Sequence, residues 1–471
     1  MRFLVFILLV CGLGAQETAT EKEAAKDVLA KMTALENSLD VPALVGRLTA
    51  DNAAREGVVA RARALMERDL LTLSDDITRH PEVGYEERNS VLKLKHYLEE
   101  HGFAVETGVA GLDTAFVARS KVARGSPVLG VIVEYDALRG TKRAFHGDQH
   151  SAQGPVGMAA AIAMAEFLAS TKTPGSVVVY GTPSEEKMPP NAKVVMHEAG
   201  VFRADVIVRS HSSIATQRSA PGFGTCCLNI DGVRYIFSGA PAHQLQAWNG
   251  RNALEAVIHL FENIDSVSSN LRPEARIQGV IVEGGAAPNV VPDRTVADFY
   301  IRYPDAVYLK QVREFTDNAA RAAALSTGTK VKIDHYGQHR DGISVATLEE
   351  VAFAYLKKYG ATKIQDRPGA PIGYEETGVV SRDIPGVGFS AYTSSGAYHT
   401  YEMEADALTS IGHDGFVTDA QAMAALLFDF CTHPEFRETV KREHDALKIL
   451  FGEYQSGLEK VYSVPRVPDP Q

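Results

Sequence analysis

The feature that most constrains the fold is an alternation of uninterrupted apolar runs with helical segments between residues 128 and 212. The runs VLGVIV, SVVVYG and ADVIVRS are rich in β-branched residues, and GPVGMAAAIAMAEFLAS and NAKVVMHEAGVF separate them with helix-like patterns. Strands that are apolar along their whole length belong to sheets covered on both faces. The sequence therefore predicts an α/β protein whose main domain has three layers, α/β/α.

A second pattern occupies residues 222–335, in the order strand, helix, strand, strand, helix, strand. This is the order of a small ferredoxin-like domain. A chain of 471 residues is long for one hydrophobic core, so two domains are expected. We predict an inserted lid or dimerisation domain at 222–335, a catalytic domain formed by 53–221 and 336–471, and a helical extension at 16–52.

The N-terminus, MRFLVFILLVCGLGAQ, places one arginine before a short apolar run that ends in small residues. This pattern predicts a signal peptide over residues 1–15, cleaved near Ala15, with an uncleaved anchor as the alternative. The run is too short for a comfortable membrane span, so no stable membrane insertion is expected. The predicted location is secreted or periplasmic.

The charge and the cysteines exclude several classes of protein. A formal net charge of −11 without any basic run argues against nucleic-acid binding. The cysteines beyond the leader, Cys226, Cys227 and Cys431, form neither a disulfide framework nor a zinc-site spacing. Buried thiols are the simpler interpretation.

Polar residues that suit metal binding follow three of the apolar runs. His146, Asp148 and His150 lie in the turn before the first helix, Glu185 and Glu186 follow the next strand, and His211 follows the third. In open α/β sheets, ligands bind at the carboxyl ends of the strands, so these separate segments share one location.

Aspartate and histidine are suitable ligands for divalent ions, and two adjacent glutamates allow one to bind metal while the other acts as a base. Each group also has an ordinary explanation: HGDQH as a polar turn, the glutamate pair as solvated charge, and His211 as a capping or surface group. Their shared position at strand ends favours a metal site.

Several motifs in order extend the argument along some 370 residues: RHPEVGYEE, EYDAL, HGDQH, GTPSEE, AHQLQAWNGRNALEA, GGAAPNVVPDRTVADFYIR, YHTYE and IGHDGF. In these stretches the chain resembles the aminoacylase and carboxypeptidase-G family of dinuclear metallohydrolases. Within that family it looks most like the aminobenzoyl-glutamate hydrolases and related N-acyl-amino-acid and dipeptide amidohydrolases.

The resemblance implies a role for each matching residue. Two divalent ions, zinc or manganese with cobalt as a further option, would be held by Asp148, His150, Glu186, His211 and His399. Glu185 would be the general base. His243, on the inserted domain, would stabilise the oxyanion, in this family often from a partner subunit. Asn289 and Arg302 would hold the substrate, and the guanidinium of Arg302 suits a carboxylate.

The chain departs from the family pattern at three places. Asp148 stands where this branch usually has cysteine, which favours harder ions such as manganese or cobalt. KMPPNAK replaces a glycine-rich stretch after the glutamate pair, which leaves substrate specificity open, and Glu376 stands where aspartate is usual.

The resemblance predicts a homodimeric, metal-dependent amidohydrolase that cleaves an N-acyl amino acid, an aminobenzoyl-glutamate-like conjugate or a dipeptide. The alternatives are a catalytically inactive relative that binds amino-acid conjugates, and a hydrolase of a xenobiotic or toxin amide.

Overall fold

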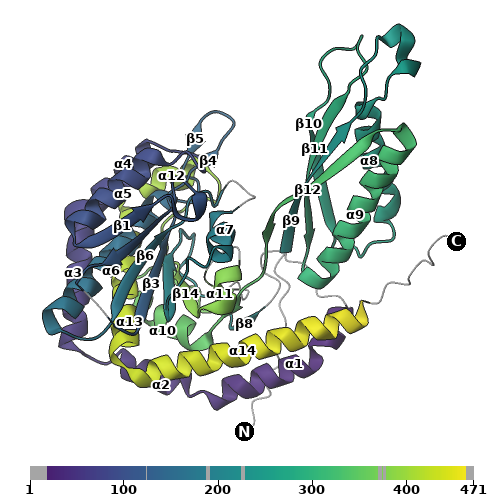
Figure 1. Cartoon of the computed structure of the whole chain (residues 1–471). Helices are drawn as coiled ribbons and strands as arrows, with labels where there is room; N and C mark the ends of the chain where they lie inside the picture. Colours follow the sequence, from purple (N-terminus) through teal and green to yellow (C-terminus); the bar gives the residue numbers. More distant parts are fainter. Residues whose placement is uncertain are drawn as a thin grey trace. The chain divides into compact units, whose positions relative to one another are not determined.

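The computed structural model describes residues 19–122, 125–186, 191–223, 229–369, 374 and 378–462 (Figure 1). The predicted signal peptide, Cys226 and Cys227, residues 187–190 of the KMPPNAK stretch, and Glu376 lie outside these residues. The chain forms two compact units. Among the described residues, the larger unit lies within 31–223 and 336–451, and the smaller unit within 19–30, 229–335 and 452–462.

The larger unit is built on a six-stranded sheet in the order β1-β2-β6-β3-β7-β14. The four strands β6, β3, β7 and β14 run parallel, and β1 and β2 are antiparallel to their neighbours. The strands are β1 (Phe103–Thr107), β2 (Phe116–Ser120), β3 (Val128–Val133), β6 (Ser176–Gly181), β7 (Val206–Ser210) and β14 (Gly386–Phe389). Two short ribbons pair β4 (Leu138–Arg139) with β5 (Ala144–Phe145), and β8 (Gly222–Phe223) with β13 (Ile343–Ser344).

Helices cover both faces of this sheet (Figure 1). Leu129, Val131 and Val133 of β3 pack into the larger core cluster with α6 (His150–Thr171) and α13 (Ser410–Thr432). Ile132 faces the opposite way, toward the smaller cluster with α7 (Ala192–Glu198) and α11 (Val379–Asp383). The predicted three-layer α/β/α architecture is confirmed.

The remaining helices are α1 (Ala19–Ser38), α2 (Val41–Leu48), α3 (Ala53–Leu65), α4 (Leu71–Arg79), α5 (Arg88–Glu100), α10 (Ala346–Lys358), α12 (Tyr401–Ala407) and α14 (Pro434–Val461). A π-helical turn, Met66–Leu70, joins α3 to α4. Among the described residues α6 is long and apolar enough to cross a membrane, but most of it is buried inside the larger unit, as a core helix would be.

The smaller unit has the order β9 (Asn229–Ser238), α8 (Ala253–Ser268), β10 (Arg276–Glu283), β11 (Arg294–Tyr303), α9 (Ala306–Thr327) and β12 (Lys330–His339). Its four strands lie in the order β10-β11-β9-β12, which is the ferredoxin-like arrangement. Helices α8 and α9 lie together on one face of the sheet (Figure 1), and the Phe299 ring packs 5.7 Å from the Tyr235 ring on that side. The predicted ferredoxin-like domain is confirmed.

The two end helices contribute to both units. Residues 19–30 of α1 and 452–461 of α14 group with the smaller unit, whereas the rest of each helix groups with the larger unit. The predicted division instead treated 16–52 as an extension and assigned the whole C-terminal segment to the catalytic domain. Helical periodicity identifies the apolar face of a helix but not the core against which that face packs.

Candidate metal centre

The polar residues singled out in the sequence gather at the carboxyl edge of the parallel strands. The loop after β3 carries Glu134 and Asp136, the turn after β6 carries Glu185 and Glu186, and His211 directly follows β7. Helix α6 begins at His150, so its first turn reaches the same edge. Parallel strands that end together bring these segments into one site.

Five of the predicted ligands converge there. Ligand atoms of Asp148, His150 and Glu186 all lie within 4.8 Å of one another. The Nε2 atom of His399 is 3.0 Å from Asp148 Oδ2 and 3.7 Å from Glu186 Oε2. The His211 ring centroid lies 5.5 Å from that of His150. Segments up to 251 residues apart in the chain therefore share one small volume.

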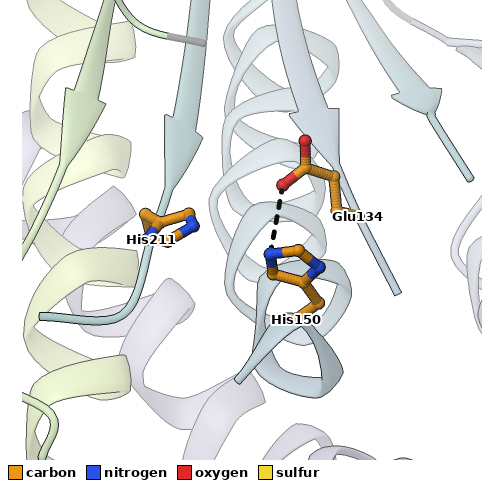
Figure 2. A group of neighbouring side chains, drawn as sticks. All are labelled: Glu134, His150 and His211. Atoms are coloured by element: carbon orange, nitrogen blue, oxygen red, sulfur yellow. Dashed lines mark ion pairs between the residues drawn. The ribbon is translucent and has the colours of Figure 1, made fainter. Parts of the chain in front are cut away.

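Glu134 forms a second possible ligand group with His150 and His211 (Figure 2), and its Oε2 lies 3.8 Å from His150 Nε2. Protein cations already neutralise this buried carboxylate. Lys193 Nζ lies 2.5 Å from Oε1, Arg209 Nη1 lies 3.4 Å from the same oxygen, and Gln153 donates to Oε2 at 2.8 Å. Glu134 is thus better suited to anchoring Lys193 and Arg209 beside the site than to binding a metal.

The ligand group has the properties of a cation site. Asp148 Oδ1 and His150 Nε2 are buried, and neither has a hydrogen-bond partner within the described part of the chain. Burial, together with repulsion from Asp148 and Asp136, raises the pKa of Glu186 to about 8. Although burial favours neutral imidazole, Asp136 and the nearby carboxylates raise the pKa of His150. A divalent cation fits here because it would replace the protons that this cluster otherwise retains.

The backbone around these ligands is locked in unusual conformations. Gln149, Ser184 and His399 have positive φ values of 53°, 57° and 62°, which cost energy for any residue except glycine. The His399 amide donates to Gly147 O at 3.0 Å, and Gln149 Nε2 donates to Met403 O at 2.7 Å. Strain that tertiary contacts maintain is characteristic of functional sites.

Asp136 belongs to this site, although the sequence motifs predict no role for it. Its Oδ1 lies 3.1 Å from His150 Nδ1, and its Oδ2 accepts the Glu186 backbone N–H at 2.8 Å. A carboxylate on the far nitrogen of a ligand histidine fixes the orientation and tautomer of the ring. Asp136 comes two residues after Glu134 at the end of β3, so the strand-end criterion that selected His146 could also have found it.

The three predicted residues of the smaller unit occupy two separate places. His243 pairs with Val290, and the Gln244 amide donates to Asn289 O at 3.2 Å, so His243 and Asn289 are neighbours. Arg302 lies near the other end of β11, roughly 30 Å away at the rise of an extended strand. Its guanidinium is half-buried 5.9 Å from the Tyr300 ring. A small substrate therefore cannot touch both Asn289 and Arg302 of the same chain.

Comparison with known proteins agrees with these features. Residues 228–327 match the peptidase dimerisation domain, which corresponds to the ferredoxin-like part of the smaller unit. Over 409 residues the chain is 30% identical to the Xaa-Arg dipeptidase of Homo sapiens, and the match covers 82% of this chain and 91% of that protein. The chain belongs to the M20 peptidase family.

Two further likenesses, one in sequence and one in fold, accompany this match. One of the subunits of the p-aminobenzoyl-glutamate hydrolase of Escherichia coli (strain K12) is 29% identical over 305 residues, covering 61% of this chain and 62% of that protein. A Bacillus subtilis protein described as a dinuclear metal-binding M20 peptidase has the same fold, with a TM-score of 0.50 and 17% identity over 77% of this chain and 98% of that one. The predicted family and the predicted class, an enzyme of the hydrolase type, are confirmed.

Proposed function

We propose that this M20 peptidase hydrolyses the amide bond of an N-acyl amino acid, an aminobenzoyl-glutamate-like conjugate or a dipeptide. The observation that carries the proposal is the convergence of Asp148, His150, Glu186 and His399 at the carboxyl edge of the sheet. The human and bacterial relatives named above act on substrates of this kind, as their names state. We infer that two divalent ions, zinc or manganese with cobalt as a further option, occupy the centre.

The metal ions and Glu185 would have different roles in hydrolysis. When bound, the ions would lower the pKa of water and polarise the amide carbonyl. Glu185 is 8% exposed and directly precedes the ligand Glu186, and we assign to it the role of the general base. It would take the proton from the attacking water and deliver it to the leaving nitrogen.

The smaller unit supplies groups that suit substrate binding. Arg302 has no carboxylate partner among the described residues, and its Nε is buried without a hydrogen bond. A half-buried, unpaired guanidinium can bind the carboxylate of an amino-acid product with two parallel hydrogen bonds. Because His243 lies beside Asn289 and not beside Arg302, it would stabilise the oxyanion in the site of a partner subunit, and this stabilisation is usually the largest catalytic contribution.

Glu185→Gln tests the proposed function. The substitution replaces the basic carboxylate with an amide of nearly the same size, so it removes the base without leaving a cavity. We expect the variant to keep both metal ions and its fold while kcat falls by about 10²- to 10⁴-fold. Metal content by mass spectrometry and turnover of a panel of N-acyl amino acids and dipeptides are the measurements. Chelation of the parent protein should abolish turnover, and readdition of zinc, manganese or cobalt should restore it.

A parental rate in Glu185→Gln would refute the role of the base. If instead the metal-loaded parent bound members of the panel without hydrolysing any of them, the chain would be an inactive binding relative. Hydrolysis confined to unrelated amides would favour the xenobiotic alternative, which the altered KMPPNAK stretch leaves open.

We also propose that the protein is exported and forms a homodimer. Export rests on the leader pattern of residues 1–15 alone. The dimer rests on the match of the smaller unit to the peptidase dimerisation domain and on the exposed apolar side chains of its edge strand β10.

A further inference from the structure

The peptide that carries Glu185 is held on both sides by buried carboxylates. The Ser184 amide, just before Glu185, donates to Glu87 Oε1 at 2.8 Å. The Glu186 amide, just after it, donates to Asp136 Oδ2 at 2.8 Å. We propose that Glu87 is a positioning residue that fixes the backbone at Ser184 and thereby sets the location of Glu185. This proposal rests on the proposed role of Glu185 as the general base.

Ser184 requires such a hold because its own conformation is unfavourable. Its φ of 57° lies in the left-handed region, which costs roughly 1 kcal/mol for a residue with a side chain. Gly84 also approaches Ser184 closely, since a Cβ added to Gly84 would lie 2.5 Å from Ser184 Oγ and 2.9 Å from its Cα. Without the hydrogen bond to Glu87, Ser184 would relax toward an ordinary φ and rotate the following residue.

Glu87 is itself well supported in this position. Its side chain is fully buried, and Thr114 Oγ1 donates to Oε2 at 2.8 Å while Oε1 accepts from Ser184. Glu87 immediately precedes α5 in the chain, yet its side chain does not cap that helix. The Glu87 carboxylate therefore accepts a hydrogen bond from the loop after β6 and none from the first turn of α5.

Burial makes this arrangement costly for stability. Burial and the neighbouring Asp136 raise the pKa of Glu87 to about 7. A carboxylate in this environment costs free energy that an apolar side chain would not. A carboxylate at position 87 is explained by its function, because it keeps the Ser184 backbone in the position that catalysis needs.

Three variants separate positioning from general stability. Glu87→Ala removes the acceptor for the Ser184 amide, and Glu87→Gln keeps an oxygen there. Thr114→Val is the matched control, because it removes the other hydrogen bond to the same carboxylate. The measurements, on the metal-loaded full chain, are hydrogen exchange of the peptide containing Ser184, metal content, thermal stability, kcat and KM.

For Glu87→Ala we expect about tenfold faster exchange at Ser184, as for the loss of one buried hydrogen bond. We also expect kcat to fall by about 10²-fold, the cost of a misplaced catalytic group, with KM and metal content close to parental. Glu87→Gln should recover most of both losses. Thr114→Val should lower thermal stability yet keep parental exchange at Ser184 and parental kcat.

Parental exchange at Ser184 in Glu87→Ala would overturn the proposal, and so would equal losses of kcat in Glu87→Ala and Thr114→Val. If the parent hydrolyses no tested amide, the proposed function fails, while the exchange data still decide whether Glu87 holds the peptide. If Glu87→Ala does not fold, Glu87→Met provides the same test, because it removes the acceptor for the Ser184 amide and nearly keeps the side-chain volume. Parental kcat in Glu87→Met would then contradict the proposal.

Discussion

The two oxygens of the Asp148 carboxylate have different surroundings. Oδ2 accepts from His399 Nε2 at 3.0 Å, whereas Oδ1 is buried without a hydrogen-bond partner among the described residues. A carboxylate placed in this way can offer one oxygen to each of two ions. The branch that the chain resembles usually has a cysteine at this position. Asp148 would therefore offer a hard oxygen ligand where those proteins have a soft sulfur ligand.

Substitution of Asp148 should therefore change which metal binds and how much of it. We expect Asp148→Asn to lose at least one ion, because the amide has one oxygen and no charge. Asp148→Cys should keep both ions and increase the ratio of zinc to manganese relative to the parent, because thiolate prefers the softer ion. Metal content after dialysis against equimolar zinc and manganese measures both effects. Two ions per chain in Asp148→Asn would contradict a bridging role.

Strand β10 forms the edge of the four-stranded sheet and carries an apolar surface. Val280 and Val282 are 64% and 57% exposed, and Ile281 between them is 45% exposed. An edge strand with free main-chain groups and apolar side chains readily pairs with a second copy. We therefore assign the proposed dimer contact to β10.

Val280→Lys combined with Val282→Lys should convert the dimer to a monomer, because lysines on an edge strand oppose pairing. Light scattering after size exclusion should give the mass of one chain instead of two. Leu325→Lys is the matched control, since Leu325 is 85% exposed on α9 of the same unit and should leave the dimer intact. A dimer that survives the double substitution would place the contact elsewhere.

Much of the fold and the ligand set could be predicted because both depend on chain order. Parallel strands end at one edge, so residues that follow β3, β6 and β7 had to meet there. The roles of Asp136 and Glu87 could not be predicted in this way. Each acts by accepting a backbone N–H from a distant turn, and the path of a turn in space leaves no periodic pattern in the sequence.

For the helices too, spacing in the sequence predicts the helical segments but not how the chain departs from regular helix within them. Apolar residues recur at helical spacing from Ala53 to Thr78, whereas the structure has two helices there, α3 and α4, joined by a π-helical turn at Met66–Leu70. The buried residues Leu65 and Leu70 are five residues apart across this turn, one more than the usual helical step of three or four, and that single long step is the only trace of the π-helical turn in the spacing. The separation of Asn289 from Arg302 by the length of β11 also follows only once the strand is defined.

Over the whole molecule, buried carboxylates make stability depend on pH. In the larger unit, burial raises the pKa values of Glu349, Glu87, Asp419 and Asp429 to about 8, 7, 7 and 6. For each group the folded state retains a proton that the unfolded chain releases between its ordinary pKa and the raised one. The free energy of unfolding therefore decreases as pH rises through this window.

Glu349 is suited to a test of this pH dependence, because it is not among the predicted metal ligands and lies far from most of them in the sequence. It is buried in α10, where its Oε2 accepts the Ser219 amide at 3.1 Å. Burial, with repulsion from Glu350 and Glu443, outweighs the effects of Ser219 and Arg218 and raises its pKa to about 8. Below its ordinary pKa of 4.5 this group carries no charge in either state, and above about pH 8 its contribution no longer changes.

Glu349→Gln keeps an oxygen for the Ser219 amide and removes the titration. Between about pH 5 and pH 8 the parent should lose up to about 1.4 kcal/mol of unfolding free energy per pH unit from this group, and the variant should not. Urea unfolding of the metal-loaded protein at several pH values, followed by circular dichroism, measures the difference in slope. Glu438→Gln, which removes an exposed carboxylate on α14, should retain the parental slope. Parallel pH profiles for Glu349→Gln and the parent would mean that Glu349 is ionised in the folded protein.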